Sequence, residues 1–524
     1  MDLNQLLMKL KYSTNNKLEY YKGGKKIIKH FSEVYEDVIK VSKLFKSMEM
    51  NKGDRIAILG KNSYEWIVID LACVIGGIIT LPLEIGKKYD IEELRKTFDL
   101  KIIVTDNEAI YGEDRVYSFN EIMTKANDGF NNIIEEVVQV KYNENDCFTI
   151  ISTSGTSGQS KFGEVSKQSF DHLISRTQEL YEFVSEDRFL VFLPLNIYLE
   201  RCYVYSSILI GFDIILTPLE YIFHSIQNDK PSVIIGIPYF FENFHNIFLE
   251  KINAKWINRL VYNSYLFTIK LGLGFLIGSQ FKPFVKAWGG NIRYLLTGAA
   301  PIRQNTLSFY EDMGIRLYEG YGMSEVGGMI TLNSPKSYKR GSVGKPFPDK
   351  LVTLDEQGQI LVKSKYNANT SYLKANIEEN SKTYLADGTI ATGDIGYFDE
   401  NGFLYINGRV KDLIVTSTGK KIHPTYVEEH MINSGCFSNC VVYGDNKPYL
   451  VALLVPKDND LNPERIKAEI DGINDKLHTD SKIINYAVVR EKFTTDNKLL
   501  TNTYKVSRVN VYRTFEKEIA ELYE

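Results

Sequence analysis

The stretch CFTIISTSGTSGQSKFG, residues 147–163, carries an apolar run straight into a loop of small and hydroxyl-bearing residues around one lysine, Lys161. The run CFTIIS has the β-branched and aromatic character of a buried strand. In the loop, glycines let the backbone approach an anion, while N–H groups, hydroxyls and Lys161 supply donors and positive charge. By itself, the stretch fits a polyphosphate-binding loop or a polar surface turn equally well.

The two commonest phosphate loops do not fit this stretch. A Walker A loop requires Gly in place of Ser160 and Ser or Thr in place of Phe162. No G-x-G-x-x-G motif is present, and GLGFLIG at 272–278 has one residue too many. The rest of the chain must therefore decide what the loop binds.

Short apolar strands alternate with longer helical stretches as far as about residue 330, which predicts parallel sheets. The strand-like runs are RIAIL (55–59), KIIVT (101–105), FTIIS (148–152), FLVFL (189–193), FDIIL (212–216) and SVIIG (232–236). From Gly341 the pattern changes to short strands and turns, with DENG at 399–402 as a hairpin turn. Residues 412–524 are long enough for a small separate domain.

The predicted fold class is therefore α/β. We expect a large N-terminal domain of mixed, mostly parallel sheets with helices plus a β-rich subdomain, and a small C-terminal α+β domain. The length of 524 residues allows two to four domains.

Composition excludes several classes of protein. Lys and Arg number 62 against 66 Asp and Glu, a net charge of -4, so we expect no nucleic-acid partner. Five cysteines without a C-x-x-C pair argue against a disulfide framework or a zinc site. The start MDLNQLLMKLKYST lacks a long apolar core and a small-residue cleavage site, so we expect a cytoplasmic protein.

Two apolar stretches need separate interpretation. Asp70 and a double glycine interrupt residues 66–86, which we interpret as a buried helix and strand. Lys270 interrupts residues 265–281. This second stretch either packs in the core or forms an apolar face that gives peripheral membrane contact or lines an acyl-chain entrance.

Five further motifs follow the loop in a fixed order along the chain. They are TGAAPI (297–302), YEGYGMSE (318–325), TGD (392–394), GRVKDLI (408–414) and LLTNTYK (499–505). With TSGTSGQSK, this set resembles the adenylate-forming (AMP-binding) enzyme family and is most similar to its long-chain fatty acid-CoA ligases, the acyl-CoA synthetases.

The resemblance implies an acid-thiol ligase that first joins a fatty acid to ATP, giving acyl-AMP and pyrophosphate. Mg²⁺, a hard cation that takes oxygen ligands, would be held by Glu325 and Thr156. Lys505 would place an ammonium between the α-phosphate and the attacking carboxylate, so Lys505, Glu325 and Thr156 are the expected catalytic residues. The expected phosphate-binding residues are Thr153, Ser154, Gly155, Thr156, Ser157, Gly158 and Lys161.

The resemblance also implies where the nucleoside binds. Asp394 would accept hydrogen bonds from both ribose hydroxyls, and Arg409 would support the same ribose. The expected adenine-binding residues are Gly298, Ala299, Ala300, Tyr321, Gly322 and Ser324.

A mobile domain would carry Lys505 to the distant phosphate loop. The expected division is an N-terminal domain at 1–408, a hinge at 409–411 centred on Lys411, and a C-terminal domain at 412–524. After rotation, the acyl group would pass to coenzyme A. Gly419 would leave room for pantetheine, and Lys420 and Lys421 would either meet coenzyme A phosphates or simply be solvated.

Three segments resemble those of the family's long-chain members and so imply a medium- or long-chain fatty acid: FLPLNIYLERC (192–202), GIPYFFENFHNIF (236–248) and AWGGNIRYLLTGAAPI (287–302). Between the last two, residues 248–285 either wall an alkyl tunnel, where burial stabilises each methylene by about 0.8 kcal/mol, or belong to the core. The sequence leaves oligomeric state open.

The sequence departs from the family pattern at Ser157, Ser160, Phe162, Lys167, Ile197 and Asn502. Phe162 either alters the loop or packs beneath it. Three alternatives also stay open: transfer to the phosphopantetheine of a separate carrier protein, an aryl or unusual acid as substrate, and an inactive scaffold with this fold.

Overall fold

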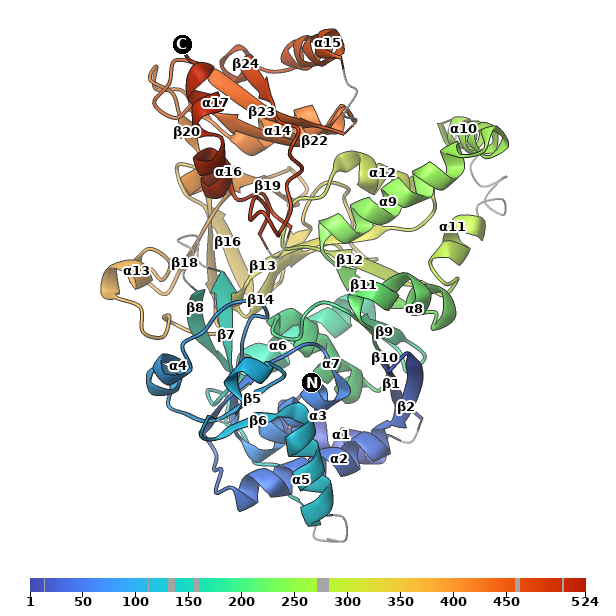
Figure 1. Ribbon diagram of the computed structural model, residues 1–524, viewed down its shortest axis with the longest axis vertical. Coiled ribbons are helices and arrows are strands. Elements are labelled where there is room, and N and C mark those ends of the chain that lie inside the picture. The colour runs from blue at the N-terminus through green and yellow to red at the C-terminus, as the bar shows by residue number, and fades with distance from the viewer. Residues whose placement is uncertain are drawn as a thin grey trace.

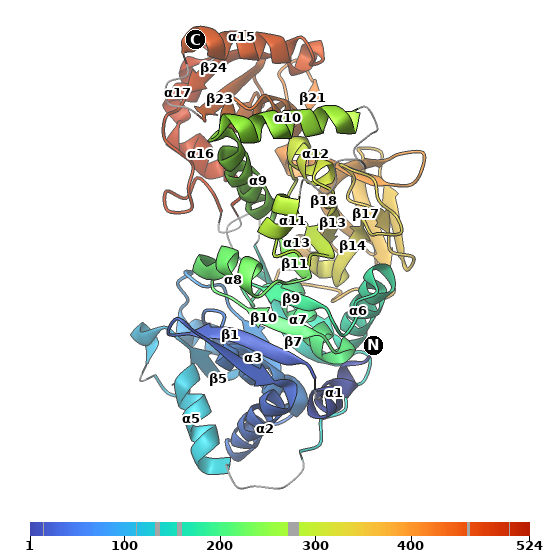
Figure 2. The same cartoon turned by 90° about the vertical axis from the view of Figure 1, so that its right-hand side faces the viewer.

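A computed structural model of the chain describes residues 1–13, 15–111, 113–130, 137–154, 160–270, 282–457, 462–501 and 504–524. The elements form a large N-terminal part and a small C-terminal part stacked on one end of it, at the top of Figure 1. The turned view separates the same two parts (Figure 2).

One sheet of the N-terminal part has the strand order β6-β5-β3-β4-β7-β8. All its neighbouring strands are parallel except β7 and β8, which are antiparallel. The strands are β3 (Arg55–Leu59), β4 (Ile79–Pro82), β5 (Leu100–Thr105), β6 (Val116–Ser118), β7 (Cys147–Ser154) and β8 (Ser160–Ser166). The Ser/Gly-rich loop therefore connects the last two strands at one edge of this sheet.

A second sheet has the order β15-β14-β13-β12-β11-β9-β10-β1-β2, with parallel pairing from β1 through β13. Its strands are β1 (Lys17–Lys22), β2 (Lys25–His30), β9 (Arg188–Val191), β10 (Asp213–Leu216), β11 (Val233–Gly236), β12 (Tyr294–Thr297), β13 (Leu317–Met323), β14 (Gly328–Leu332) and β15 (Lys345–Pro346). All six apolar runs form strands, so the predicted mostly parallel sheets are confirmed.

Helices cover both sheets. Those of the N-terminal part are α1 (Leu6–Tyr12), α2 (Phe31–Ser47), α3 (Tyr64–Gly76), α4 (Ile91–Phe98), α5 (Phe119–Phe130), α6 (Lys167–Tyr181), α7 (Tyr198–Ile210), α8 (Ile222–Asn228), α9 (Pro238–Asn253), α10 (Trp256–Lys270), α11 (Lys282–Ala287), α12 (Gln304–Asp312) and α13 (Ile377–Ser381).

Helix α3 is the predicted buried helix. The Ser63 hydroxyl caps its start by accepting a hydrogen bond from the Trp66 N–H at 3.0 Å, and Gly77, at φ 75°, ends it in a left-handed conformation. Every residue from Trp66 to Ile75 is buried, as expected for a helix that is apolar all round. In the described part of the chain, no helix has the length and apolar character needed to span a membrane.

A buried ion pair fastens α3 to α7. Arg201 on α7 lies 3.3 Å from Asp70 on α3, and both side chains are almost fully buried. Arg201 also donates to the hydroxyls of Thr80 on β4 and Thr149 on β7, at 3.2 and 2.9 Å. Thr149 lies on the strand that leads into the Ser/Gly-rich loop, so this pair supports the base of that loop.

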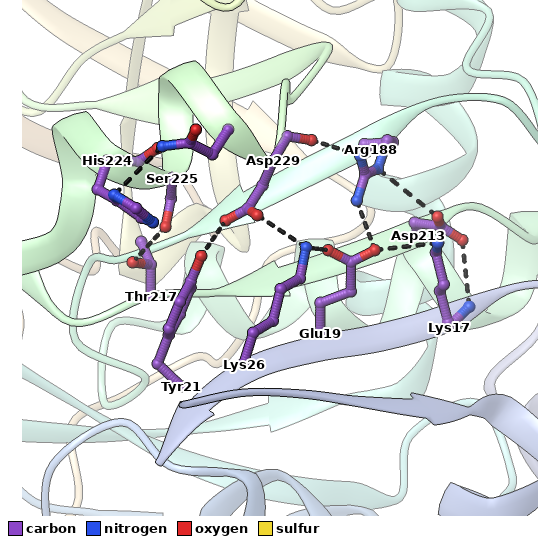
Figure 3. A network of polar contacts seen from close by, with 11 residues as sticks. Lys17, Glu19, Tyr21, Lys26, Arg188, Asp213, Thr217, His224, Ser225 and Asp229 are labelled. Carbon is purple, nitrogen blue, oxygen red and sulfur yellow. Dashed lines mark hydrogen bonds and ion pairs between the residues drawn. The ribbon is translucent and has the colours of Figure 1, made fainter. Parts of the chain in front are cut away.

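A second polar network ties the β1-β2 hairpin to the rest of the second sheet (Figure 3). The buried Glu19 on β1 pairs with Lys17 at 3.1 Å, with Arg188 of β9 at 2.6 Å, and with Lys26 on β2. Lys26 also pairs with Asp229, just after α8, at 2.7 Å. The β1-β2 hairpin is thereby held at the sheet edge.

The β-rich subdomain is an antiparallel sheet that leads to the C-terminal part. Its strands, in order, are β16 (Lys350–Leu354), β17 (Gln359–Ser364), β18 (Ile390–Phe398) and β19 (Leu404–Arg409). Between β18 and β19, the Gly402 N–H donates to the Asp399 carbonyl at 3.0 Å, which confirms the predicted hairpin turn.

The C-terminal part has its own core. Its strands are β20 (Ile414–Val415), β21 (Lys421–Ile422), β22 (Phe437–Tyr443), β23 (Leu450–Pro456) and β24 (Ile483–Val488), and its helices are α14 (Pro424–Asn433), α15 (Pro463–Asn474), α16 (Arg508–Thr514) and α17 (Glu516–Glu521). One face of the β22-β23-β24 sheet packs with α14 and α15 and the other with α16 and α17, because alternate residues point to opposite faces. The predicted small α+β unit is confirmed.

Candidate active site

A large cleft lies between the two parts, at the carboxyl ends of β11, β12 and β13. It encloses about 2560 Å³ and is lined by residues of both parts. Open parallel sheets bind ligands at this end of their strands. A site for one small ligand usually measures about 300–1,000 Å³, so this cleft has room for more than one substrate.

The predicted adenine-binding residues all line this cleft: Gly298, Ala299, Ala300, Tyr321, Gly322 and Ser324. A Cβ on Gly298, just after β12, would lie 2.8 Å from the Gly320 carbonyl oxygen on β13. A Cβ on Gly322 would lie only 2.0 Å from the Gly328 carbonyl oxygen. Both positions require glycine, because the backbones of neighbouring strands approach too closely for any side chain.

The predicted ribose-binding carboxylate is fixed by two other predicted residues. The Tyr321 hydroxyl donates a hydrogen bond to Asp394 Oδ2 at 2.7 Å, and Arg409 Nε donates to Oδ1 at 2.8 Å. Asp394 on β18 and Arg409 on β19 also face each other in register. Each carboxylate oxygen accepts up to two hydrogen bonds, so Asp394 keeps capacity for a ligand while Tyr321 and Arg409 fix its orientation.

The strands on either side of the predicted phosphate loop, β7 and β8, pair with each other in antiparallel register. Thr153 pairs with Lys161, and Ser154 with Ser160, in the β7-β8 register. Lys161 lines the cleft. The predicted Gly155, Thr156, Ser157 and Gly158 lie outside the described residues, as does Asn502.

Tyr372, a residue that the sequence did not indicate, contacts both Lys161 and Glu325. Lys161 Nζ lies 4.6 Å from the centre of the Tyr372 ring, and the Tyr372 hydroxyl donates a hydrogen bond to Glu325 Oε1. Glu325 sits in a short 3-10 turn after β13 and is buried. Tyr372 lies in no recognisable motif, so only the tertiary structure reveals that it connects the lysine to the carboxylate.

Glu325 is a suitable magnesium ligand, because it supplies carboxylate oxygens next to Tyr372, whose ring also contacts Lys161. The described residues contain no cluster of three or more His, Cys, Asp or Glu that could hold a metal ion by itself. Mg²⁺ at nucleotide sites is commonly bound by one or two carboxylates together with substrate phosphates, so a lone Glu325 fits this ion.

Phe162, the departure adjoining Lys161, packs beneath the hairpin. Its ring meets Phe98 edge to face with centroids 4.7 Å apart, and its carbonyl accepts a hydrogen bond from the Leu373 N–H at 2.7 Å. Of the two interpretations of Phe162, the structure favours packing. Phe162 also brings the segment containing Tyr372 against β8.

Lys505 enters the cleft from the C-terminal part. The Thr501 N–H donates to the Lys505 carbonyl at 2.7 Å, and the Tyr504 N–H donates to the Thr501 carbonyl at 2.8 Å, so a tight turn presents the lysine. Partial desolvation and then the positive charge of Arg409 lower the pKa of Lys505 from its ordinary 10.5. This lysine therefore lies near the Asp394–Arg409 pair.

Two contacts hold the Lys505 turn and its domain against the N-terminal part. The Tyr504 ring stacks on Tyr239 at the start of α9, with centroids 4.5 Å apart and an interplanar angle of 3°. Arg303 pairs with Glu242 at 3.3 Å and donates to the Ser438 carbonyl of the C-terminal part at 3.4 Å. Sequence gave no sign of either contact.

The predicted hinge and coenzyme A residues lie on the C-terminal side of the cleft. Lys411 is in a 3-10 turn directly after β19 and lines the cleft, and desolvation lowers its pKa. Lys421 lines the cleft as well. Gly419, at φ 78°, and Lys420, 3.1 Å from Asp480, are not among the described lining residues in this arrangement.

The cleft also has an apolar side. It is lined by Ile197, Tyr198, Leu199, Tyr203, Ile235, Leu296, Met329 and Leu332. From the predicted tunnel segment 248–285, the described lining residues are Leu249, Glu250 and Asn253 only. Phe248 and Phe284 pack with Trp288 and Phe309 in a filled aromatic core, so the core interpretation applies to those side chains.

Residues of both parts of the chain, Lys505 among them, line one cleft at the strand ends of an α/β fold. The sequence profile of the AMP-binding enzyme family matches residues 18–369, and that of the AMP-binding enzyme C-terminal domain matches residues 411–524. The chain therefore belongs to the AMP-binding enzyme family, which confirms the resemblance and the expected class of AMP-forming ligases.

Individual relatives agree with this assignment. The chain is 28% identical to the long-chain-fatty-acid-CoA ligase FadD15 of Mycobacterium bovis, over 91% of this chain and 89% of that protein. It is 24% identical to long chain acyl-CoA synthetase 3 of Arabidopsis thaliana, over 96% and 88%.

Solved structures share the fold at lower identity. The anthranilate CoA ligase AuaEII in complex with anthranoyl-AMP matches with a TM-score of 0.79 at 16% identity, over 99% of this chain and 98% of that one. The o-succinylbenzoate coenzyme A synthetase of Bacillus subtilis, in complex with ATP and magnesium, matches with 0.73 at 20% identity, over 96% and 98%.

Proposed function

We propose that the chain activates a medium- or long-chain fatty acid with ATP, releasing pyrophosphate and forming acyl-AMP, and then transfers the acyl group to coenzyme A. The observation that carries this proposal is the meeting of Lys505 from one part with Tyr321, Asp394 and Arg409 from the other in one cleft. The long-chain relatives and the apolar side of the cleft support a fatty acid.

In the first half-reaction, the substrate carboxylate attacks the α-phosphorus of ATP. The Lys505 ammonium offsets negative charge as these two anions meet, and Lys161 with the strand ends at Thr153 and Ser154 holds the outer phosphates. Glu325 and, in this proposal, Thr156 would hold Mg²⁺, which would supply further positive charge to the phosphates. Tyr321 and the wall at Gly298–Ala300 hold the adenine, and Asp394 takes the ribose hydroxyls.

The second half-reaction requires a different face of the C-terminal part. We place the domain boundary at 408, the hinge at 409–411 and the mobile domain at 412–524. Rotation about Lys411 would withdraw Lys505 and present Gly419, Lys420 and Lys421 to coenzyme A. The absence of Gly419 and Lys420 from the described cleft lining fits a domain held in the adenylate-forming position.

Three alternatives lead to different products. A carrier-protein acceptor would use the same first half-reaction and apolar side. An aryl acid would use the same nucleotide residues. The two aryl-acid ligases compared above share the fold with this chain at 16% and 20% identity. An inactive scaffold would have no reason to keep Lys505, Glu325, Asp394 and Arg409 around one cleft.

Acid-dependent ATP-pyrophosphate exchange tests the proposal. We expect exchange with fatty acids of one length class, little with benzoate-type acids, and acyl-CoA formation once coenzyme A is added. Exchange without thioester formation would point to a carrier protein as the acceptor. Exchange with aryl acids alone would show that the substrate is an aryl acid and not a fatty acid. No exchange with any acid would favour the inactive scaffold. We propose a cytoplasmic enzyme that contacts membranes peripherally, since long-chain acids partition into bilayers.

A further inference from the structure

Helix α10 presents an apolar face to solvent. Exposed fractions are 75% for Trp256, 59% for Leu260 and 64% for Phe267, and Ile257 and Val261 are exposed beside them. Leu260 and Phe267 follow Trp256 and Leu260 by four and seven positions, and Val261 follows Ile257 by four, so these residues share one side of the helix. The opposite side is anchored, because Tyr265 is buried and its hydroxyl donates to the Asp312 carbonyl at 2.7 Å.

The position of α10 makes this face accessible. The helix lies at the outer edge of the molecule in Figure 1 and crosses the front of the view in Figure 2. A row of large apolar side chains on the outside of a folded chain marks a surface that meets another apolar phase.

The exposed charged residues at the start of α10 are basic, while Glu250 on α9 precedes them and Asp312 lies behind the helix at Tyr265. Lys251, Lys255 and Arg259 are exposed on and next to α10, and Lys286 is exposed on α11. The sequence has no Asp or Glu between positions 251 and 310. Basic side chains at the border of an apolar helix face suit an anionic lipid surface, because each adds electrostatic attraction to the burial of the apolar side chains.

We propose that the α10 face, defined by Trp256, Ile257, Leu260, Val261 and Phe267, docks the protein on bilayers that carry anionic lipids. A second copy of the chain fits less well, because segment 251–310 of each copy has no Asp or Glu to pair with Lys255 and Arg259 of the other. The biological purpose of this docking rests on the proposed function: α9, which precedes α10, contributes Leu249 and Asn253 to the cleft, so docking would bring the cleft near the bilayer that holds the fatty acid. The docking itself does not depend on that function.

Trp256 gives a direct probe of this docking. The chain has three tryptophans, and Trp66 and Trp288 are buried. We expect vesicles of equimolar phosphatidylcholine and phosphatidylglycerol to shift the fluorescence of the full chain to shorter wavelength and to sediment it. Vesicles of phosphatidylcholine alone should bind at least about tenfold less protein.

Variants locate the contact. Leu260→Ser with Phe267→Ser, and separately Lys255→Glu with Arg259→Glu, should each weaken binding about tenfold or more. Ile377→Ser is the matched control, because Ile377 is 88% exposed on α13, away from α10, and this variant should bind like the wild type.

Several results would overturn the inference. These are equal binding to both vesicle types, equal binding by all variants, or a dimer in light scattering that Leu260→Ser with Phe267→Ser dissociates. Pyrophosphate exchange with a short soluble acid, measured without vesicles, keeps this test separate from the proposed function. Normal exchange with no vesicle binding would reject only the docking, whereas vesicle binding without exchange would reject only the reaction.

Discussion

Gly298–Ala300 and Tyr321 are held by neighbouring strands of one parallel sheet, whereas Lys505 stands on a turn of the C-terminal part. The first group is anchored by backbone approaches that only glycine permits. The second meets the N-terminal part through a tyrosine stack, the Arg303–Ser438 hydrogen bond and its cleft neighbours. We therefore propose that the sheets of the N-terminal part form a fixed frame for the nucleotide, and that the C-terminal part brings the charge of Lys505 to this frame and can leave it.

The largest expected effect comes from breaking the frame. Arg201→Met would leave Asp70 buried without its partner, at a cost of about 3–5 kcal/mol in the free energy of unfolding, measured by urea titration. Arg176→Ala, which removes an exposed pair with Glu179 on α6, should cost under about 1 kcal/mol. Equal losses in the two variants would mean that the buried pair does not hold the frame.

Removing the delivered charge should leave the frame intact. Lys505→Ala should lower pyrophosphate exchange by about 10²–10³-fold while sparing thioester formation from supplied acyl-AMP, because the lost ammonium acts only in the first transition state. Lys498→Ala, on the same C-terminal segment but outside the cleft lining, is the control. A parallel fall of both half-reactions would contradict the role given to Lys505.

Tyr372 belongs to the frame and should have an intermediate effect. Tyr372→Phe keeps the ring beside Lys161 but removes the donor to Glu325, and hydrogen bonds to charged groups contribute about 1.5–3 kcal/mol. We expect roughly tenfold slower exchange and a higher Mg²⁺ concentration for half-maximal rate. Tyr366→Phe, which lies outside the cleft lining, should change neither value.

The pH profile should report the delivered lysine. Because the pKa of Lys505 is lowered and its charged form is the active one, exchange should decline on the alkaline side at a pH below 10.5. Lys505→Arg, which stays charged, should move that decline to higher pH at reduced rate. An unchanged alkaline limb in Lys505→Arg would assign the titration to another group.

The smallest effect should come from the tyrosine stack. Tyr239→Ala removes an interaction of about 0.5–1.5 kcal/mol that holds the Lys505 turn, so exchange should fall about threefold to tenfold with thioester formation unchanged or faster. Tyr239→Phe keeps the ring and should behave like the wild type. A loss in both half-reactions would place Tyr239 in the frame instead.

Sequence predicted the elements whose signals are local. β-branched runs became strands, and TGAAPI, YEGYGMSE and TGD each reach the cleft because they follow or form strands of the sheets. Tyr372 and Tyr239 could not be predicted from the sequence. Tyr372 contacts Glu325, which is more than 40 positions away in the chain, and Tyr239 contacts Tyr504 in the C-terminal part. The sequence also could not decide how Phe162 packs, because its partner Phe98 lies far away in the chain.

The most direct test of the account is a single-turnover experiment with ATP labelled at the α-phosphate and a long-chain fatty acid. Without coenzyme A, we predict pyrophosphate release and labelled acyl-AMP that stays with the protein. Adding coenzyme A should then release labelled AMP together with acyl-CoA. Formation of ADP and phosphate, or AMP release without an acyl-AMP stage, would contradict the claim that one cleft forms an adenylate and then consumes it.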